Sequence, residues 1–240
     1  VPGERDRHLF NVQGMNIRQC ANVEDEKRGH GFRSVSREIL LYLDPETNEV
    51  LRDWENPWTG EVVEVIHVAN DPVNMRGPLY AYSADGEPHR FEGRFMRGRV
   101  WLSGETPLFY RNPLGGDYQA YVGGWYHAME MLNSYAYEEE LVDRELPTLK
   151  RYSLSWARVS DWLPWMQMNG RPGVMIFTTV GTRVGGIDEL SEPLLTELRE
   201  KYPDYAEPPP LDDQRSNETS WTYFRKVLDQ RIKAGEARDD

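Results

Sequence analysis

The sequence predicts a mainly β protein, either an antiparallel meander or a lipocalin-like barrel, that ends in two short helices. Short runs of β-branched and aromatic residues follow one another, turn residues separate them, and few helical patterns intervene. A length of 240 residues fits one large β-domain. We therefore expect a single β-rich domain over residues 1–234 and a flexible tail over residues 235–240.

The first half of the chain is a series of strand and turn patterns. Residues 37–43 and 49–54 resemble two strands, and the turn-like residues 44–48 between them predict a hairpin. The run over residues 61–68 is rich in β-branched residues and extends the meander. Further strands are expected over residues 78–82, 91–95 and 100–102.

The second half adds strands and then helices. Residues 125–141 fit a helix by propensity at first, but the later Tyr/Ser alternation favours a strand, which we prefer. Residues 152–159 and 174–180 predict a strand pair. A short helix is expected from Ser191 to Lys201, and a second one from an Asn217 or Thr219 cap.

Composition excludes several function classes. The net charge of −12, with no long Lys/Arg run, opposes nucleic-acid binding. No apolar stretch approaches the roughly 20 residues that cross a bilayer, so no membrane partner is expected. Cys20 is the only cysteine, which excludes a disulfide framework within the chain and a cysteine-rich zinc site. No phosphate-binding glycine loop, nucleophile elbow or HExxH motif occurs, so we expect no cofactor.

Eight Trp and thirteen Tyr suggest a pocket for a flat apolar ligand. His67 alternates with Val63 and Val65, so a strand would turn its imidazole to the apolar side. A core histidine with one hydrogen-bond partner is the commoner arrangement. A histidine inside a ligand-holding barrel is instead a ready general base near neutral pH.

The role expected of His127 depends on whether residues 125–141 form a helix or a strand. On a helix it would meet Glu130, whereas on a strand the two side chains face opposite ways and His127 shares a face with Asn133 and Tyr135. That polar and aromatic stripe either lines a cavity or is exposed. Trp125 begins the same segment and is a candidate to contact an aromatic substrate.

Two arginines are candidates to bind an anionic group. Asn16, Arg18 and Cys20 would share one strand face, and Arg18 would bind a carboxylate or phenolate unless a neighbouring acid pairs with it. Trp156 and Arg158 share a face of a later strand. They would cover an apolar cavity, although plain core packing is the simpler account.

Together, five segments resemble a known family, namely residues 14–18, 56–61, 67–74, 154–160 and 217–221. The chain is similar over most of its length to the microbial family called domain of unknown function 1838. The resemblance implies one compact domain and frequent occurrence in bacteria that degrade aromatic compounds, and it assigns no catalytic residue. It also leads us to expect a further strand before Val1, so the N-terminus is taken as truncated.

The preferred hypothesis is a cofactor-independent lyase that acts on an aromatic or polycyclic small molecule, with lignin-derived dimers among the candidates. The reaction would be an elimination, a decarboxylation or a retro-aldol loss of formaldehyde, for which acid and base groups in a dry aromatic pocket suffice. His67 or His127 would be the base and Tyr135 or Tyr110 the acid. Arg18 or Arg158 would hold an anion, with Asn16, Trp156 and Trp125 beside the substrate.

Two alternatives stay open. One is a carrier of apolar ligands that uses the same pocket without turnover. The other is a metal-dependent enzyme that uses His67, His127 and Glu130. A homo-oligomer is compatible with all three hypotheses, and the sequence does not indicate where in the cell the protein acts.

Overall fold

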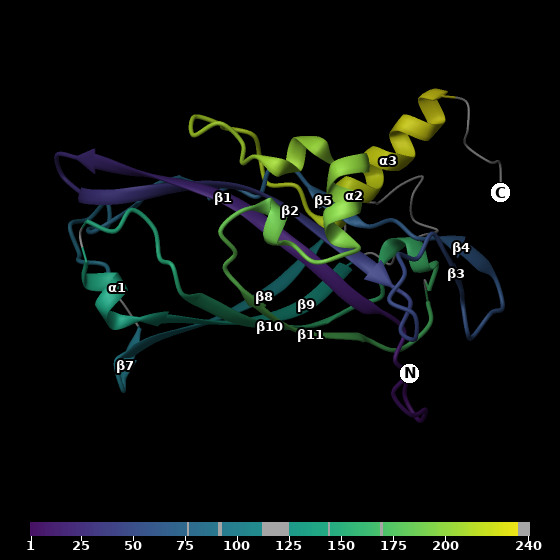
Figure 1. Ribbon diagram of the computed structural model, residues 1–240. Helices are drawn as coiled ribbons and strands as arrows, with labels where there is room; N and C mark the ends of the chain where they lie inside the picture. Colours follow the sequence, from purple (N-terminus) through teal and green to yellow (C-terminus); the bar gives the residue numbers. More distant parts are fainter. Residues whose placement is uncertain (76, 91–92, 112–124, 144, 169, 235–240) are drawn as a thin grey trace. The chain divides into compact units, whose positions relative to one another are not determined.

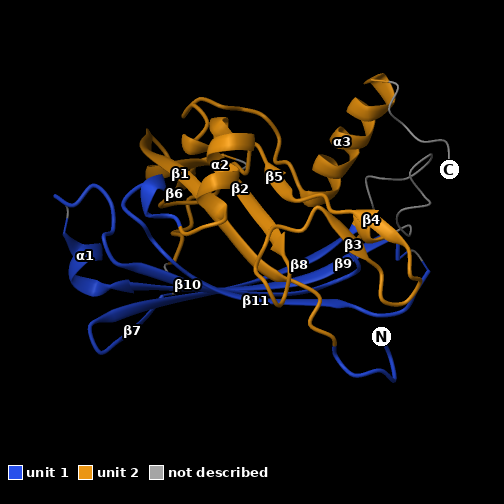
Figure 2. Ribbon diagram, turned by 45° about the vertical axis from the view of Figure 1, so that its right-hand side comes forward, with its two compact units in different colours: residues 1–6, 91–163, 167–190 blue, residues 7–90, 164–166, 191–240 orange. Residues whose placement is uncertain are grey.

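The computed structural model describes residues 1–75, 77–90, 93–111, 125–143, 145–168 and 170–234, apart from the side chains of residues 110 and 111 (Figure 1). The protein is mainly β, as predicted, and its strands pair antiparallel in three sheets. The chain divides into two compact units (Figure 2). Unit 1 comprises residues 1–6, 91–163 and 167–190, and unit 2 comprises residues 7–90, 164–166 and 191–240. The prediction of a single domain stays a prediction.

Unit 2 is built on a long hairpin of β1 (Asn11–Asp25) and β2 (Gly29–Leu43). The Asp25 carboxylate closes the turn because it accepts hydrogen bonds from the backbone N–H groups of Lys27, at 3.0 Å, and Arg28, at 2.9 Å. Gly29 follows at φ 71°, where a glycine costs least. The short strands β5 (Val68–Asn70) and β6 (Leu79–Tyr80) both pair with β2.

An aromatic cluster forms part of the core of unit 2. Trp165 lies in the 3₁₀ helix η2 (Pro164–Met166), and its ring centroid is 5.4 Å from that of Tyr42 and 5.8 Å from that of Trp54. Phe10 joins them at 5.6 Å from Trp165. Trp54 belongs to β3 (Asp53–Glu55), which pairs with β4 (Val62–Glu64) in a separate two-stranded sheet.

Two C-terminal helices complete unit 2, as predicted. They are α2 (Leu194–Lys201), followed by the 3₁₀ helix η4 (Pro203–Ala206), and α3 (Ser220–Ala234). Leu194 and Leu198 are fully buried. Of the two caps considered, Thr219 is the one used, because its Oγ1 accepts from Thr222 N–H at 3.2 Å while Thr222 Oγ1 accepts from Thr219 N–H at 2.7 Å.

Unit 1 is a five-stranded sheet in the order β11–β10–β9–β8–β7. Its strands are β7 (Arg94–Met96), β8 (Arg99–Arg111), β9 (Trp125–Tyr137), β10 (Tyr152–Ser160) and β11 (Met175–Thr182). Two short helices, α1 (Glu138–Val142) and η3 (Ile187–Glu189), lie outside the sheet. The predicted pair of residues 152–159 and 174–180 is confirmed.

Several expectations about elements need correction. Residues 125–137 form the preferred strand, but residues 138–142 are helical instead of extended. The hairpin expected over residues 37–54 is reduced to a bridge between Leu43 and Val50, because β5 pairs with residues 38–40 on the edge of β2 that β1 leaves open. The strand expected over residues 61–68 ends at Glu64.

Among the described residues, none of the three sheets closes on itself, so the prediction of a lipocalin-like barrel is not confirmed. Nor does this part of the chain contain a helix long and apolar enough to cross a membrane.

Candidate functional site

His127 in unit 1 is held by a carboxylate. It lies near the start of β9, and Asp161 directly follows β10. Asp161 Oδ2 is 2.9 Å from the backbone N of His127 and 3.2 Å from its Nδ1, and Asp161 N–H donates to His127 O at 3.0 Å. An ionised carboxylate only accepts hydrogen bonds, so the neutral ring carries its proton on Nδ1 and keeps a lone pair on Nε2.

Two aromatic rings lie beside this histidine on one face of the sheet. Phe109 stands opposite His127 in the β8–β9 register, with ring centroids 4.7 Å apart. Phe109 also stacks on Trp125 at 4.8 Å, with the two rings 12° from parallel. Phe109 is 63% exposed and Trp125 is 55% exposed. The arrangement is an open aromatic surface beside a base, and the sequence alone identified neither Phe109 nor Asp161.

The described residues place neither of the two predicted acids, Tyr135 and Tyr110, next to His127. Tyr135 shares the face of His127, as predicted, but it lies eight residues along the strand, about 26 Å away at strand spacing. There it packs edge-on against Trp101, with centroids 4.7 Å apart. Tyr110 pairs with Tyr126 in the register, but its side chain lies outside the described residues.

Arg158 and Trp156 share a face of β10, as predicted, on the side of the sheet away from His127. Arg158 Nε is 3.5 Å from Glu130 Oε1, and its Nη2 donates to the Tyr126 hydroxyl. Trp156 contacts Phe177, with centroids 5.9 Å apart. The guanidinium is therefore engaged with Glu130 and Tyr126 within the protein. That Trp156 and Arg158 cover an apolar cavity stays a prediction.

His127 and Glu130 alternate to opposite faces of β9, so they do not form the pair that a helix would have given. Across the described residues, no group of three or more His, Cys, Asp and Glu side chains is placed to hold a metal ion.

Asn16, Arg18 and Cys20 lie on β1 in unit 2 and alternate with less exposed residues, as predicted. All three are exposed. Asn16 Nδ2 donates to Ser36 Oγ at 3.4 Å. The nine candidate residues thus fall into both units, with His67, Asn16 and Arg18 in unit 2 and the others in unit 1.

His67 is buried, as its alternation with Val63 and Val65 predicted, although it follows β4 in a loop. Its Nδ1 accepts a hydrogen bond from Tyr42 N–H at 3.2 Å, and its ring stacks on that of Tyr42. Burial, and then the charge of Arg52, lower the pKa of His67 from 6.5 to about 4. Because the lone pair is already used and the ring is a weak base, this geometry does not favour His67 as a general base.

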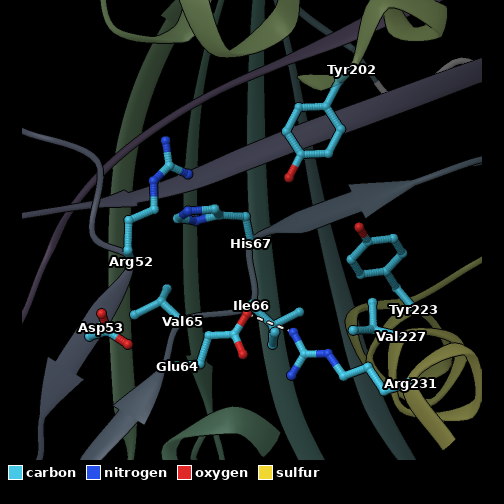
Figure 3. A pocket seen from close by; sticks show the side chains of 10 residues that line it. All are labelled: Arg52, Asp53, Glu64, Val65, Ile66, His67, Tyr202, Tyr223, Val227 and Arg231. Carbon is cyan, nitrogen blue, oxygen red and sulfur yellow. Dashed lines mark hydrogen bonds and ion pairs between the residues drawn. The ribbon is translucent and has the colours of Figure 1, made fainter. Parts of the chain in front are cut away.

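His67 also borders a pocket of about 440 Å³ in unit 2 (Figure 3). Two tyrosines that the sequence analysis missed, Tyr202 and Tyr223, line it together with Arg52. The spacing of Tyr223, Val227 and Arg231 marks one face of α3 and was the available signal. The position of Tyr202 follows only from the packing of α2 in three dimensions.

Comparisons with known proteins identify a family and nothing more specific. Searches of curated proteins and of solved structures each found no match. The family model described as "Protein of unknown function (DUF1838)" matches residues 1–228, nearly the whole chain. This agrees with the resemblance seen in the five sequence segments, and the chain therefore belongs to the DUF1838 family.

Proposed function

We propose that the protein is a cofactor-independent lyase that acts on an aromatic small molecule, with His127 as its general base. The observation that carries the proposal is the hydrogen bond from His127 Nδ1 to Asp161, which leaves Nε2 free to accept a proton. Phe109 and Trp125 supply the surface on which a flat ring would lie. The lipocalin-like closure that would enclose this surface stays a prediction.

The reaction needs only proton transfer. In an elimination, His127 Nε2 removes a proton from a substrate carbon, the C–H electron pair forms a double bond conjugated with the ring, and the leaving group departs with its own electron pair. The imidazolium returns the proton to the leaving group, so no oxidant or reductant is consumed. In a retro-aldol step His127 Nε2 removes the proton of a hydroxyl, the O–H electron pair forms the carbonyl of formaldehyde, and the C–C bond breaks. The electron pair of that bond is delocalised into the substrate's aromatic system, and the imidazolium then returns the proton to the carbon left behind.

A carrier is the second candidate. The distance of about 26 Å between Tyr135 and His127 favours it, because the predicted acid is not beside the base. In that case the exposed rings of Phe109 and Trp125 would bind an aromatic molecule without converting it.

The test is turnover of a panel of lignin-derived dimers, followed by mass spectrometry. We expect His127→Gln to reduce the rate by at least about a hundredfold and Asp161→Asn by at least about tenfold, because an asparagine no longer holds the proton on Nδ1. Tyr135→Phe and His8→Gln are the controls, and both should keep the wild-type rate. Wild-type turnover by His127→Gln would remove this histidine from the mechanism.

Two further outcomes separate the alternatives. Binding of a dimer without any product, lost in Trp125→Ala, would favour the carrier. Elemental analysis of the purified protein tests the metal-dependent alternative, since stoichiometric zinc, iron or manganese would overturn the cofactor-free proposal.

A further inference from the structure

The pocket in unit 2 has the size and lining of a site for a small ligand. Its volume of about 440 Å³ lies within the range typical of such sites. The loop between β4 and β5 forms one wall, with Val65, Ile66 and His67, and α3 forms another, with Tyr223 and Val227. Every lining residue belongs to unit 2, so the pocket is separate from His127.

Two phenol groups in the pocket have no partner within the described chain. Neither the Tyr202 nor the Tyr223 hydroxyl makes a hydrogen bond among the described residues. In Figure 3, each hydroxyl group lies on the side of its ring that faces His67. Burial raises the pKa of Tyr202, and burial together with Tyr202 raises that of Tyr223 to about 12. Both groups therefore keep their protons at neutral pH and are available as donors.

The end of the pocket near Tyr202 carries excess positive charge. Arg52 Nη2 donates to Glu197 Oε1, and Lys201 Nζ is 3.2 Å from the other oxygen of the same carboxylate. Burial alone would raise the pKa of the Glu197 carboxyl group, but Arg52 and Lys201 together lower it. One carboxylate therefore faces two cations, which leaves one positive charge in excess. A guanidinium has five N–H donors, and the bond to Glu197 leaves others on Arg52 available.

The opposite end carries no such excess. Arg231 Nη2 donates to Glu64 Oε1 at 2.6 Å, and Figure 3 shows this pair and Asp53 away from Tyr202. His67 brings no charge at neutral pH. An anionic group would thus find a net positive charge at one end only.

We propose that this pocket binds a small carboxylic acid. Its carboxylate lies between Arg52 and the hydroxyls of Tyr202 and Tyr223, and its apolar body lies along Val65, Ile66 and Val227. The proposal does not depend on the lyase reaction, because it uses no residue of the His127 surface.

Calorimetric titration with benzoate, and with methyl benzoate as its uncharged match, tests the proposal. We expect benzoate to bind at least about tenfold more tightly, because only the carboxylate draws charge-assisted hydrogen bonds from Arg52 and the two phenols. The double variant Tyr202→Phe/Tyr223→Phe keeps both rings and should weaken benzoate binding by at least about tenfold. Tyr82→Phe, an exposed tyrosine of the same unit, and His127→Gln should both bind benzoate as the wild type does.

Three results would overturn the proposal. These are equal affinity for benzoate and methyl benzoate, an undiminished benzoate affinity in the double variant, and no detectable binding of benzoate up to about 10 mM. Circular dichroism of the double variant shows whether a loss of binding comes from loss of the fold, and Tyr223→Phe alone is the milder variant if it does.

Discussion

At the scale of single residues, His67 shows how burial changes what a histidine can do. Its ring is enclosed in unit 2, its Nδ1 is occupied by the Tyr42 N–H group, and Arg52 and Lys201 add positive charge nearby, which Glu197 partly offsets. The neutral form is therefore the one that the folded protein keeps.

This burial predicts a pH-dependent stability. The pKa of His67 is about 4 in the folded protein and 6.5 in an exposed histidine, so between these values the unfolded chain takes up a proton that the folded protein does not. The contribution is complete above pH 6.5 and is lost as the pH falls toward 4, by about 3 kcal/mol at most. Urea unfolding of the wild type at pH 5 and pH 7 measures it.

The matched variants are His67→Gln, which does not titrate, and His8→Gln, which changes an exposed histidine. The difference in unfolding free energy between pH 5 and pH 7 should shrink in the first and persist in the second. The same pH dependence in His67→Gln as in the wild type would mean that other groups cause it.

At the scale of elements, α3 depends on its N-terminal cap. Thr219→Ala removes the hydroxyl that accepts from Thr222 N–H, and we expect a loss of about 1 kcal/mol in the free energy of unfolding. Thr219→Ser and Thr219→Asp retain an acceptor and should stay close to the wild type. Urea unfolding distinguishes them, and equal stability of all three variants would show that the cap contributes nothing.

The β1–β2 hairpin depends on a close approach at Gly14. A Cβ atom at this position would overlap the backbone oxygen of Ile39 on the neighbouring strand. We expect Gly14→Ala to destabilise the protein by about 1–3 kcal/mol. Gly104→Ala on β8 is the matched control, because its Cβ would meet nothing within 4 Å, and it should change the stability by less than about 1 kcal/mol. Equal effects of the two substitutions would contradict this account.

Local patterns predicted some elements well and others poorly. Alternation identified the β10–β11 pair, and proline and cap residues identified α2 and α3, because these signals lie within a few residues of one another. The pairing of β5 with β2 was missed because it joins residues 68–70 to residues 38–40, which are far apart in the sequence. The same limit applies to the candidate sites: alternation predicted that His67 is buried, but only the β9–β10 register brings Asp161 to His127.

At the scale of the whole molecule, the two units are not consecutive in the sequence. The segment Pro164–Met166 lies between two strands of unit 1, yet it belongs to unit 2, where Trp165 packs among Phe10, Tyr42 and Trp54. Residues distant in the chain therefore share one core.

Trp165 is expected to contribute strongly to stability. It is 4% exposed, and Trp165→Ala should lower the free energy of unfolding by about 3–5 kcal/mol through the cavity it leaves. Trp165→Phe should cost clearly less, since it keeps an aromatic ring and removes an Nε1–H group that has no hydrogen-bond partner among the described residues. Urea unfolding followed by circular dichroism measures both, and equal losses would show that the ring does not fill the core as described.

The place of Pro164–Met166 in the chain also has a consequence for synthesis. The β1–β2 hairpin leaves the ribosome early, but the tryptophan that completes the cluster around Tyr42 is made more than a hundred residues later. Until then, the aromatic residues of a nascent chain that later contact Trp165 would stay exposed to solvent or to a chaperone. Translation arrested just before residue 164 should accordingly yield chains that are more easily cleaved by protease than those arrested after α3.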